Sequence, residues 1–268
     1  MFTKQQIFEQ LKQMNAPQDR PVIVHTSLKT VGEVEGRAQG LLDSLIEYFT
    51  AGGGLLIVPT HTWANFYELK KEIALDLNDH KTCIGTFPEI ALADGRGVRT
   101  LNPTHSVVVF GDKEKVAEFI QNENLADTPT SPSGVYGKVF DWNGYALLVG
   151  VGQDKNTILH CVEEYLDVPN RLSSEYVKMK IKQMDGSIIE KSCRYMKTDG
   201  IEDVSLFFPK YEPAFRFYGA ITDGFIANAK TQLCCARKMK DVMTLIARNS
   251  GGIEILNDDT PLKESWYK

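Results

Sequence analysis

The amino-acid sequence predicts an α/β protein built on a mainly parallel sheet, and two observations support this prediction. Short apolar runs rich in β-branched residues are typical of buried strands, and they occur at 22–25 (VIVH), 55–59 (LLIVP), 107–110 (VVVF) and 145–149 (YALLV). Segments with apolar residues at helical spacing separate these runs. Strands that alternate with helices form parallel sheets with right-handed crossovers.

The first quarter of the chain predicts one complete strand–helix–strand unit. A helix over 3–14 comes first, with Thr3 as its N-cap and Pro17 beyond its end. Strand 22–25 then leads into the loop TSLKTVGEVEG and a helix that the glycines at 52–54 end. Strand 55–59 completes the unit, so two parallel strands are expected here.

The rest of the chain adds helices and one antiparallel element. Helices are expected at 86–94 with Thr86 as a candidate cap, at 113–124, from Thr157 onward, and at 240–249. Alternating residues around Asp185-Gly186 predict a hairpin, which we expect as an insert at the edge of the sheet, around 171–197. The aromatic stretch 207–218 predicts a lid or a packing segment. No repeat or long linker interrupts the chain, so we expect a single domain over 1–268.

Composition excludes several classes of protein. The 268 residues carry a net charge of -5, with 43% hydrophobic and 24% charged residues, which is ordinary for a globular chain. No basic run could follow a phosphate backbone, so nucleic acid is not expected as a partner, and a mildly acidic surface favours a cationic ligand. The five cysteines form no CxxC pair and follow no secretory leader, which predicts free thiols and a cytoplasmic location. No apolar run approaches the ~20 residues that cross a membrane.

His105 is the first candidate for chemistry. It lies between Thr104 and Ser106, follows Pro103, and leads directly into strand 107–110. A histidine held at the mouth of a buried sheet is well placed to act as a general base. For the triplet taken alone, the commoner case is a histidine that is merely hydrogen-bonded by its two neighbours in a structural loop.

Elimination narrows the chemistry further. The sequence contains no GxGxxG, no GxxxxGK[ST] and no GxSxG, so the usual dinucleotide, P-loop and α/β-hydrolase signatures are absent. Four histidines remain near strand ends, His25, His61, His105 and His160, whereas His80 lies in a polar surface stretch. They could bind a divalent metal in a hydrolase, although no ligand-like spacing is present.

The alternative to a metal-dependent hydrolase is an acyltransferase that uses a histidine base. One histidine would remove a proton from an amine, which then attacks an acyl donor. The loop TSLKT at 26–30 offers hydroxyls and N–H groups to a pyrophosphate-like group, or is a plain polar connection. His160, Glu163 and Glu164 share one helix face and provide acids nearby.

Five motifs resemble one known family when they are taken together. VIVHTSLKTVGEVEG, LLIVPTHTW, RTLNPTHSVVVFG, SPSGVYGKV and LLVGVGQDKNTILHCVEE occur, over about 22–164, in the order and spacing of the aminoglycoside 3-N-acetyltransferases. The resemblance implies transfer of an acetyl group from acetyl-CoA to the 3-amine of a 2-deoxystreptamine antibiotic, without a metal. It also implies a three-layer α/β/α sandwich that differs from the GNAT fold. A homodimer is one of the expected states of assembly.

The resemblance also implies roles for individual residues. His105 resembles the catalytic base, with Glu163 orienting it or binding the cationic substrate. The residues implied for CoA are His25, Thr26, Ser27, Leu28, Lys29 and Thr30, with Thr104 and Ser106 near its thioester; those implied for the amine are Trp63, Asp127 and Glu164. One departure is Asn102, where many members have histidine. A protein that binds CoA but has lost the antibiotic acceptor is a further alternative.

Overall fold

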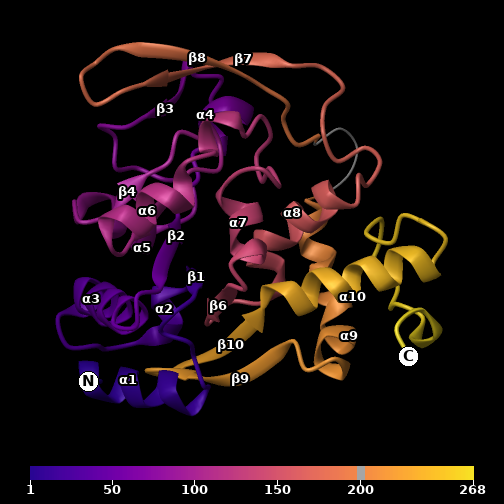
Figure 1. Cartoon of the computed structure of the whole chain (residues 1–268), viewed down its shortest axis with the longest axis horizontal. Coiled ribbons are helices and arrows are strands. Elements are labelled where there is room, and N and C mark those ends of the chain that lie inside the picture. The colour runs from indigo at the N-terminus through magenta and orange to yellow at the C-terminus, as the bar shows by residue number, and fades with distance from the viewer. Residues whose placement is uncertain (198–202) are drawn as a thin grey trace.

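The computed structural model describes residues 1–197 and 203–268, and a seven-stranded sheet crosses the centre of this part of the chain (Figure 1). The strand order is β4-β5-β2-β1-β6-β10-β9. The bounds are β1 Pro21–Thr26, β2 Leu55–Pro59, β4 Val98–Arg99, β5 Val107–Phe110, β6 Tyr145–Val149, β9 Ile221–Ile226 and β10 Ala229–Cys235. The α/β class predicted from the sequence is confirmed.

Strand direction places the later chemistry at one edge of this sheet. The central strands β2, β1 and β6 are parallel neighbours. β5 runs antiparallel to β2, and β10 runs antiparallel to β6. β4 and β9 each reverse direction again, so five of the seven strands point the same way. The carboxyl ends of β1, β2 and β6 therefore meet the amino end of β5.

Helices cover both faces of the sheet. Alternate residues of β1 point to opposite faces: Ile23 belongs to one buried cluster, Val22 and Val24 to the other. The second cluster packs under α1 (Lys4–Gln13), α3 (Arg37–Thr50) and α5 (Thr86–Ala93). The first packs under α6 (Lys113–Ile120), α7 (Val135–Asp141), α8 (Ile158–Tyr165), α9 (Glu212–Phe217) and α10 (Ala236–Asn249). The result is the expected three-layer sandwich.

The predicted hairpin is present but does not extend the main sheet. β7 (Val177–Lys182) and β8 (Ile188–Cys193) are antiparallel on either side of the Asp185-Gly186 turn. β7 pairs in parallel with β3 (Ile73–Asp76) to form a separate three-stranded sheet, at the top of Figure 1. The expected place at the sheet edge is therefore wrong, because β3 offers β7 a partner and packs with the hairpin in a small cluster of Ala74, Met179 and Cys193.

Several short elements were not predicted. The TSLKT loop contains the one-turn helix α2 (Leu28–Val31), and α4 (Trp63–Tyr67) follows β2. The described residues also contain the 3-10 helices η1 (Glu123–Leu125), η2 (Gln153–Lys155), η3 (Val204–Tyr211) and η4 (Glu264–Trp266). Part of the aromatic stretch packs in the core, since Phe208, Tyr211 and Phe215 are buried. Among the described residues, no helix combines the length and apolar character needed to cross a membrane.

Candidate active site

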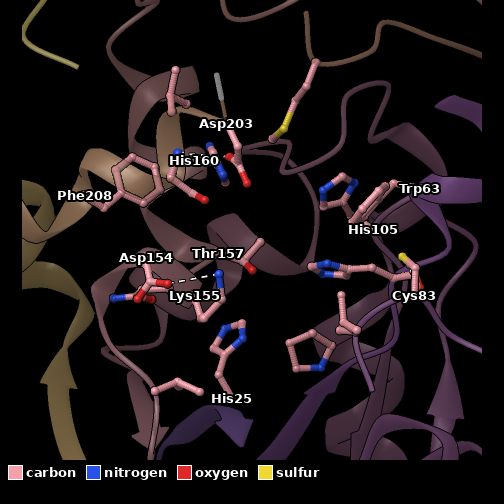
Figure 2. A pocket seen from close by; sticks show the side chains of 18 of the residues that line it. His25, Trp63, Cys83, His105, Asp154, Lys155, Thr157, His160, Asp203 and Phe208 are labelled. Carbon is pink, nitrogen blue, oxygen red and sulfur yellow. Dashed lines mark hydrogen bonds and ion pairs between the residues drawn. The ribbon is translucent and has the colours of Figure 1, made fainter. Parts of the chain in front are cut away.

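A cavity of about 910 Å³ lies at the edge of the sheet where β1, β2 and β6 end, within the size range of small-molecule sites. His25 is the penultimate residue of strand β1, and His61 follows β2. His105 precedes β5, and His160 comes from α8. Figure 2 shows His25, His105 and His160 around one common space. The four histidines predicted near strand ends thus line the same cavity.

The register of two strands explains why His61 and His105 meet. Pro59 pairs with Val107 in the antiparallel β2–β5 ladder. Backbone hydrogen bonds continue this pairing beyond the strands, with Thr60 N–H donating to Ser106 and Thr62 N–H donating to Thr104. His61 and His105 are therefore opposite each other, with ring centroids 4.5 Å apart.

The carboxylate of Glu163 contacts His160, not His105. One turn of α8 brings His160 Nδ1 within 2.8 Å of Glu163 Oε2, because residues three apart share a helix face. Arg171 Nε donates to the other oxygen of Glu163. The expectation that Glu163 orients His105 is therefore wrong. Glu163 is almost fully buried, whereas the His160 side chain is 13% exposed and lines the cavity.

His105 has a different environment. Its Nδ1 lies 2.9 Å from Thr104 Oγ1, and its backbone N–H donates to Asn102 Oδ1 at 2.9 Å. Burial lowers the pKa of His105 to about 3, with a smaller contribution from His160. Burial also lowers the pKa of His25 to about 4 and that of His61 well below its usual value. These three rings are neutral near pH 7.

The loop predicted to hold CoA reaches the cavity only in its first part. His25, Thr26 and Ser27 line the cavity, whereas Leu28, Lys29 and Thr30 belong to α2 and do not. His25 Nε2 and Thr26 Oγ1 are buried and have no hydrogen-bond partner among the described residues. Buried polar atoms are almost always paired in native proteins, so two unpaired atoms in one cavity wall fit a polar ligand.

The hydroxyls beside His105 point elsewhere. Ser106 is fully buried, and its Oγ lies 3.0 Å from both the hydroxyl and the carbonyl oxygen of Thr60. Thr104 Oγ1 faces the His105 ring. Neither residue lines the cavity, because the β2–β5 pairing holds them within the sheet.

Only two of the three residues predicted to bind the amine substrate lie at the cavity. Trp63 and Glu164 line the cavity, but Asp127 does not. Asp127 accepts a hydrogen bond from Tyr176, just before the hairpin, at 2.8 Å. Glu164 accepts from the Thr128 hydroxyl and from the N–H and hydroxyl of Thr130. Burial raises the Glu164 pKa, and these hydrogen bonds oppose that effect.

Other cavity residues had no clear signal in the sequence. The turn after β6 contributes Asp154, Lys155 and Thr157, and the segment around η3 contributes Asp203 and Phe208 (Figure 2). The glycines before QDKNT mark a close backbone approach, which could have indicated this turn. Arg171 could not be found from the sequence, because its contact with Glu163 depends on the chain's path beyond α8.

The arrangement suits proton transfer better than metal binding. Within residues 1–197 and 203–268, no three His, Cys, Asp or Glu side chains gather so that they could hold a metal ion. The fold and cavity define an α/β protein with a carboxylate-bound histidine facing a ligand-sized cavity, which is an arrangement typical of enzymes that use a general base.

Comparison with known proteins gives the family. The sequence model of the aminoglycoside 3-N-acetyltransferases matches residues 23–247, so the chain belongs to this family. It is 26% identical over 179 residues to the SPbeta prophage-derived aminoglycoside N(3')-acetyltransferase-like protein YokD of Bacillus subtilis (strain 168), covering 60% of this chain and 64% of YokD. It is 26% identical over 171 residues to aminoglycoside N(3)-acetyltransferase IV of Salmonella sp, covering 63% and 61% respectively. The match thus spans less than two thirds of the length of each of these two relatives.

Solved structures share the fold over nearly the whole chain. The crystal structure of Bacillus subtilis YokD gives a TM-score of 0.76 at 20% identity, covering 95% of this chain and 96% of that one. The binary complex of AAC-IIIb with CoASH gives 0.75 at 17% identity, covering 92% and 96%. A mutant of aminoglycoside acetyltransferase AAC(3)-IVa in complex with gentamicin gives 0.74 at 21% identity, covering 98% and 97%. The fold is thus that of the family's acetyltransferases.

Proposed function

We propose that the protein is an acetyl-CoA-dependent N-acetyltransferase that acetylates the 3-amine of a 2-deoxystreptamine aminoglycoside or a related amine, with His160 and Glu163 as the general-base pair. The observation that carries the proposal is the 2.8 Å contact between His160 Nδ1 and the buried Glu163 carboxylate in the wall of a ligand-sized cavity. Family membership supports the reaction class.

The two His160 nitrogens have distinct parts in this proposal. A carboxylate only accepts hydrogen bonds, so the Nδ1 proton points to Glu163 and Nε2 keeps a lone pair. An aliphatic ammonium has a pKa near ~10 and must lose a proton before it can attack. The ammonium first gives up one proton to solvent. As the neutral amine nitrogen then bonds to the thioester carbonyl carbon, His160 Nε2 takes the second proton from that nitrogen. The C–S bond then breaks, and the thiolate takes the proton to leave as CoASH.

His105, the base that the resemblance implies, is supported less by its surroundings. Its Nδ1 faces a hydroxyl, and no carboxylate of residues 1–197 or 203–268 is bound there to stabilise a positively charged ring. A base with a pKa of about 3 also accepts a proton poorly at neutral pH. We therefore assign proton removal to His160, and His105 is the competing candidate that the variants in the Discussion test.

Negative charge around the cavity supports a cationic acceptor, and unpaired polar atoms in its wall support a polar acyl donor. Glu68, Glu164 and Asp203 line it without an ion-pair partner among the described residues, and they favour an aminoglycoside's ammonium groups. The unpaired atoms of His25 and Thr26 are suited to the polar parts of CoA, and Lys155, which pairs with Asp154 at 3.0 Å, lines the same cavity. The sequence's net charge of -5 favours the approach of a polycation. The free thiols support a reducing compartment, and we propose the cytoplasm.

The test is a thiol-release assay with purified protein, acetyl-CoA and a panel of gentamicin-like and kanamycin-like amines. We expect release of CoASH with formation of a mono-acetylated product whose substituted nitrogen is assigned by NMR. Failure to acetylate any deoxystreptamine, together with failure to bind CoA, would remove the proposal. Tight CoA binding without turnover would favour a CoA-binding protein that lacks this acceptor. Stoichiometric zinc or manganese in protein purified without chelator would favour the metal hydrolase instead.

A further inference from the structure

His61 is a cavity histidine to which the proposed reaction gives no role. It follows β2, is 5% exposed, and lines the cavity beside His105. Its Nε2 lies 3.0 Å from the hydroxyl of Tyr136, a fully buried residue of α7. This contact determines which ring nitrogen of His61 carries the proton.

The Tyr136 hydroxyl has one proton and two neighbours. It donates to the His105 backbone carbonyl at 3.0 Å, and a carbonyl oxygen can only accept. The second contact is a hydrogen bond only if His61 Nε2 carries a proton and donates it to the Tyr136 oxygen. A neutral imidazole has one N–H group, so His61 Nδ1 is left with a lone pair.

That lone pair belongs to a ring in the cavity wall. His61 Nδ1 makes no hydrogen bond within the described residues, and it is not one of the enclosed unpaired atoms. Solvent reaches the nearly buried ring through the cavity that it lines. Burial and the neighbouring histidines lower the His61 pKa well below its usual value, so the ring remains neutral. Since no carboxylate in the described part of the chain is bound to it, His61 is suited to accept a hydrogen bond and not to remove a proton.

We propose that His61 Nδ1 accepts a hydrogen bond from an N–H or O–H donor of a reactant bound in the cavity, and that Tyr136 fixes the tautomer that makes this possible. The inference rests on the proposed function for the identity of the reactants. Two sources present such a donor: the amines and hydroxyls of an aminoglycoside, and the amide N–H groups of CoA. His61 thus contributes to substrate recognition, and Tyr136 acts through it as a positioning residue.

The tautomer is measured without any activity. In protein labelled with ¹⁵N-histidine, we expect the His61 nitrogen shifts at pH 7 to show protonated Nε2 and unprotonated Nδ1. Tyr136→Phe keeps the ring in the core but removes the hydroxyl, and it should convert these shifts to those of a tautomer mixture. Tyr48→Phe is the matched control, because Tyr48 is also buried and donates to a backbone carbonyl, that of Ala16, away from the cavity. Protonated Nδ1 in the wild-type protein would overturn the proposal.

Binding then separates the two sources. Calorimetry with gentamicin and, separately, with CoA compares the wild type with Tyr136→Phe and His61→Leu. We expect each variant to bind one of the two probes about tenfold more weakly, as the loss of one hydrogen bond predicts, and the affected probe identifies the donor. Unchanged affinity for both probes in a folded His61→Leu protein would overturn the proposal. If the wild type binds neither probe, the proposed function fails and His61 has no reactant to recognise, whatever its tautomer.

Discussion

Glu163 distinguishes His160 from the other cavity histidines through its two oxygens. Oε1 accepts from Arg171 and Oε2 contacts His160. The guanidinium fixes the carboxylate, because a buried charge needs both a counter-ion and hydrogen bonds, and the fixed carboxylate in turn orients the imidazole. Among the residues that the structure describes, His25, His61 and His105 have no such partner, and they stay neutral through burial. Similar side chains in one cavity thereby acquire different chemistry.

The pair of variants His160→Ala and His105→Ala tests this distinction. His160→Ala should lower kcat by about 2–4 orders of magnitude, the usual contribution of a general base. His105→Ala should lower it by about one order or less, since its ring would only shape the cavity. Steady-state rates of CoASH release measure both, and circular dichroism controls for folding. A near-normal rate for His160→Ala beside an inactive His105→Ala would show that the sequence-based assignment was right.

At the scale of elements, Asn102 joins two loops that form the cavity wall. Its Nδ2 donates to the carbonyls of Thr128 and Pro129 at 3.2 and 3.0 Å. Its Oδ1 accepts from the N–H groups of Thr104 and His105 at 3.2 and 2.9 Å. One buried amide therefore fixes the start of β5 against the loop that holds Glu164.

Asn102→Ala should lower the free energy of unfolding by about 2–5 kcal/mol, because buried backbone groups lose their partners at roughly 1–3 kcal/mol each. Urea denaturation measures this change. The control is Asn78→Ala, since exposed Asn78 donates from its side chain to the Gln183 carbonyl and its loss should cost about 0.5–1 kcal/mol. Equal effects of the two substitutions would contradict the proposed connection.

The elements that the sequence predicted are those with a strong local signal. β1, β2, β5 and β6 are continuous apolar runs, and Asp185-Gly186 marks the hairpin turn. β9 and β10 were missed because ITDGFI and AKTQLCC mix polar and apolar residues, as half-exposed antiparallel strands do. The partner of β7 was also out of reach, because β3 lies about 100 residues earlier in the chain and such pairing has no local signal.

The site was predictable to a similar extent. The sequence places four histidines near strand ends and so predicts that they meet at one edge of the sheet, and all four line the cavity. The partner of Glu163 could not be inferred from the resemblance, although the i,i+3 spacing of His160 and Glu163 was itself a signal for their contact. The orientation of Ser106 depends on Thr60 across the sheet, which spacing along the chain does not reveal.

At the scale of the whole molecule, buried neutral histidines make stability depend on pH. The pKa of His25 falls from 6.5 to about 4 on folding, so between these values the unfolded chain binds more protons. The free energy of unfolding then decreases as the pH falls from about 6.5 towards 4, and the His25 contribution levels off below that. His61 and His105 act in the same direction.

Chemical denaturation of the wild type and His25→Asn at about pH 7.5 and about pH 4.5 measures this effect. The wild type should lose roughly 2–3 kcal/mol more than the variant over this interval, since one pKa unit corresponds to about 1.4 kcal/mol. Carboxylates titrate in both proteins and cancel in the comparison. His80→Asn, at an exposed position, should follow the wild type. An identical pH dependence of wild type and His25→Asn would contradict the buried neutral state.

The ion pair between Arg171 and Glu254 has a consequence for engineering of the chain. Glu254 follows α10, and its Oε1 lies 2.7 Å from Arg171 Nη2, while the same guanidinium binds Glu163. Deleting residues from 250 onward would remove no residue that lines the cavity. It would, however, remove one of the two anions that restrain Arg171. Shortened versions of the chain should therefore end beyond Glu254, so that both anions that restrain Arg171 are kept.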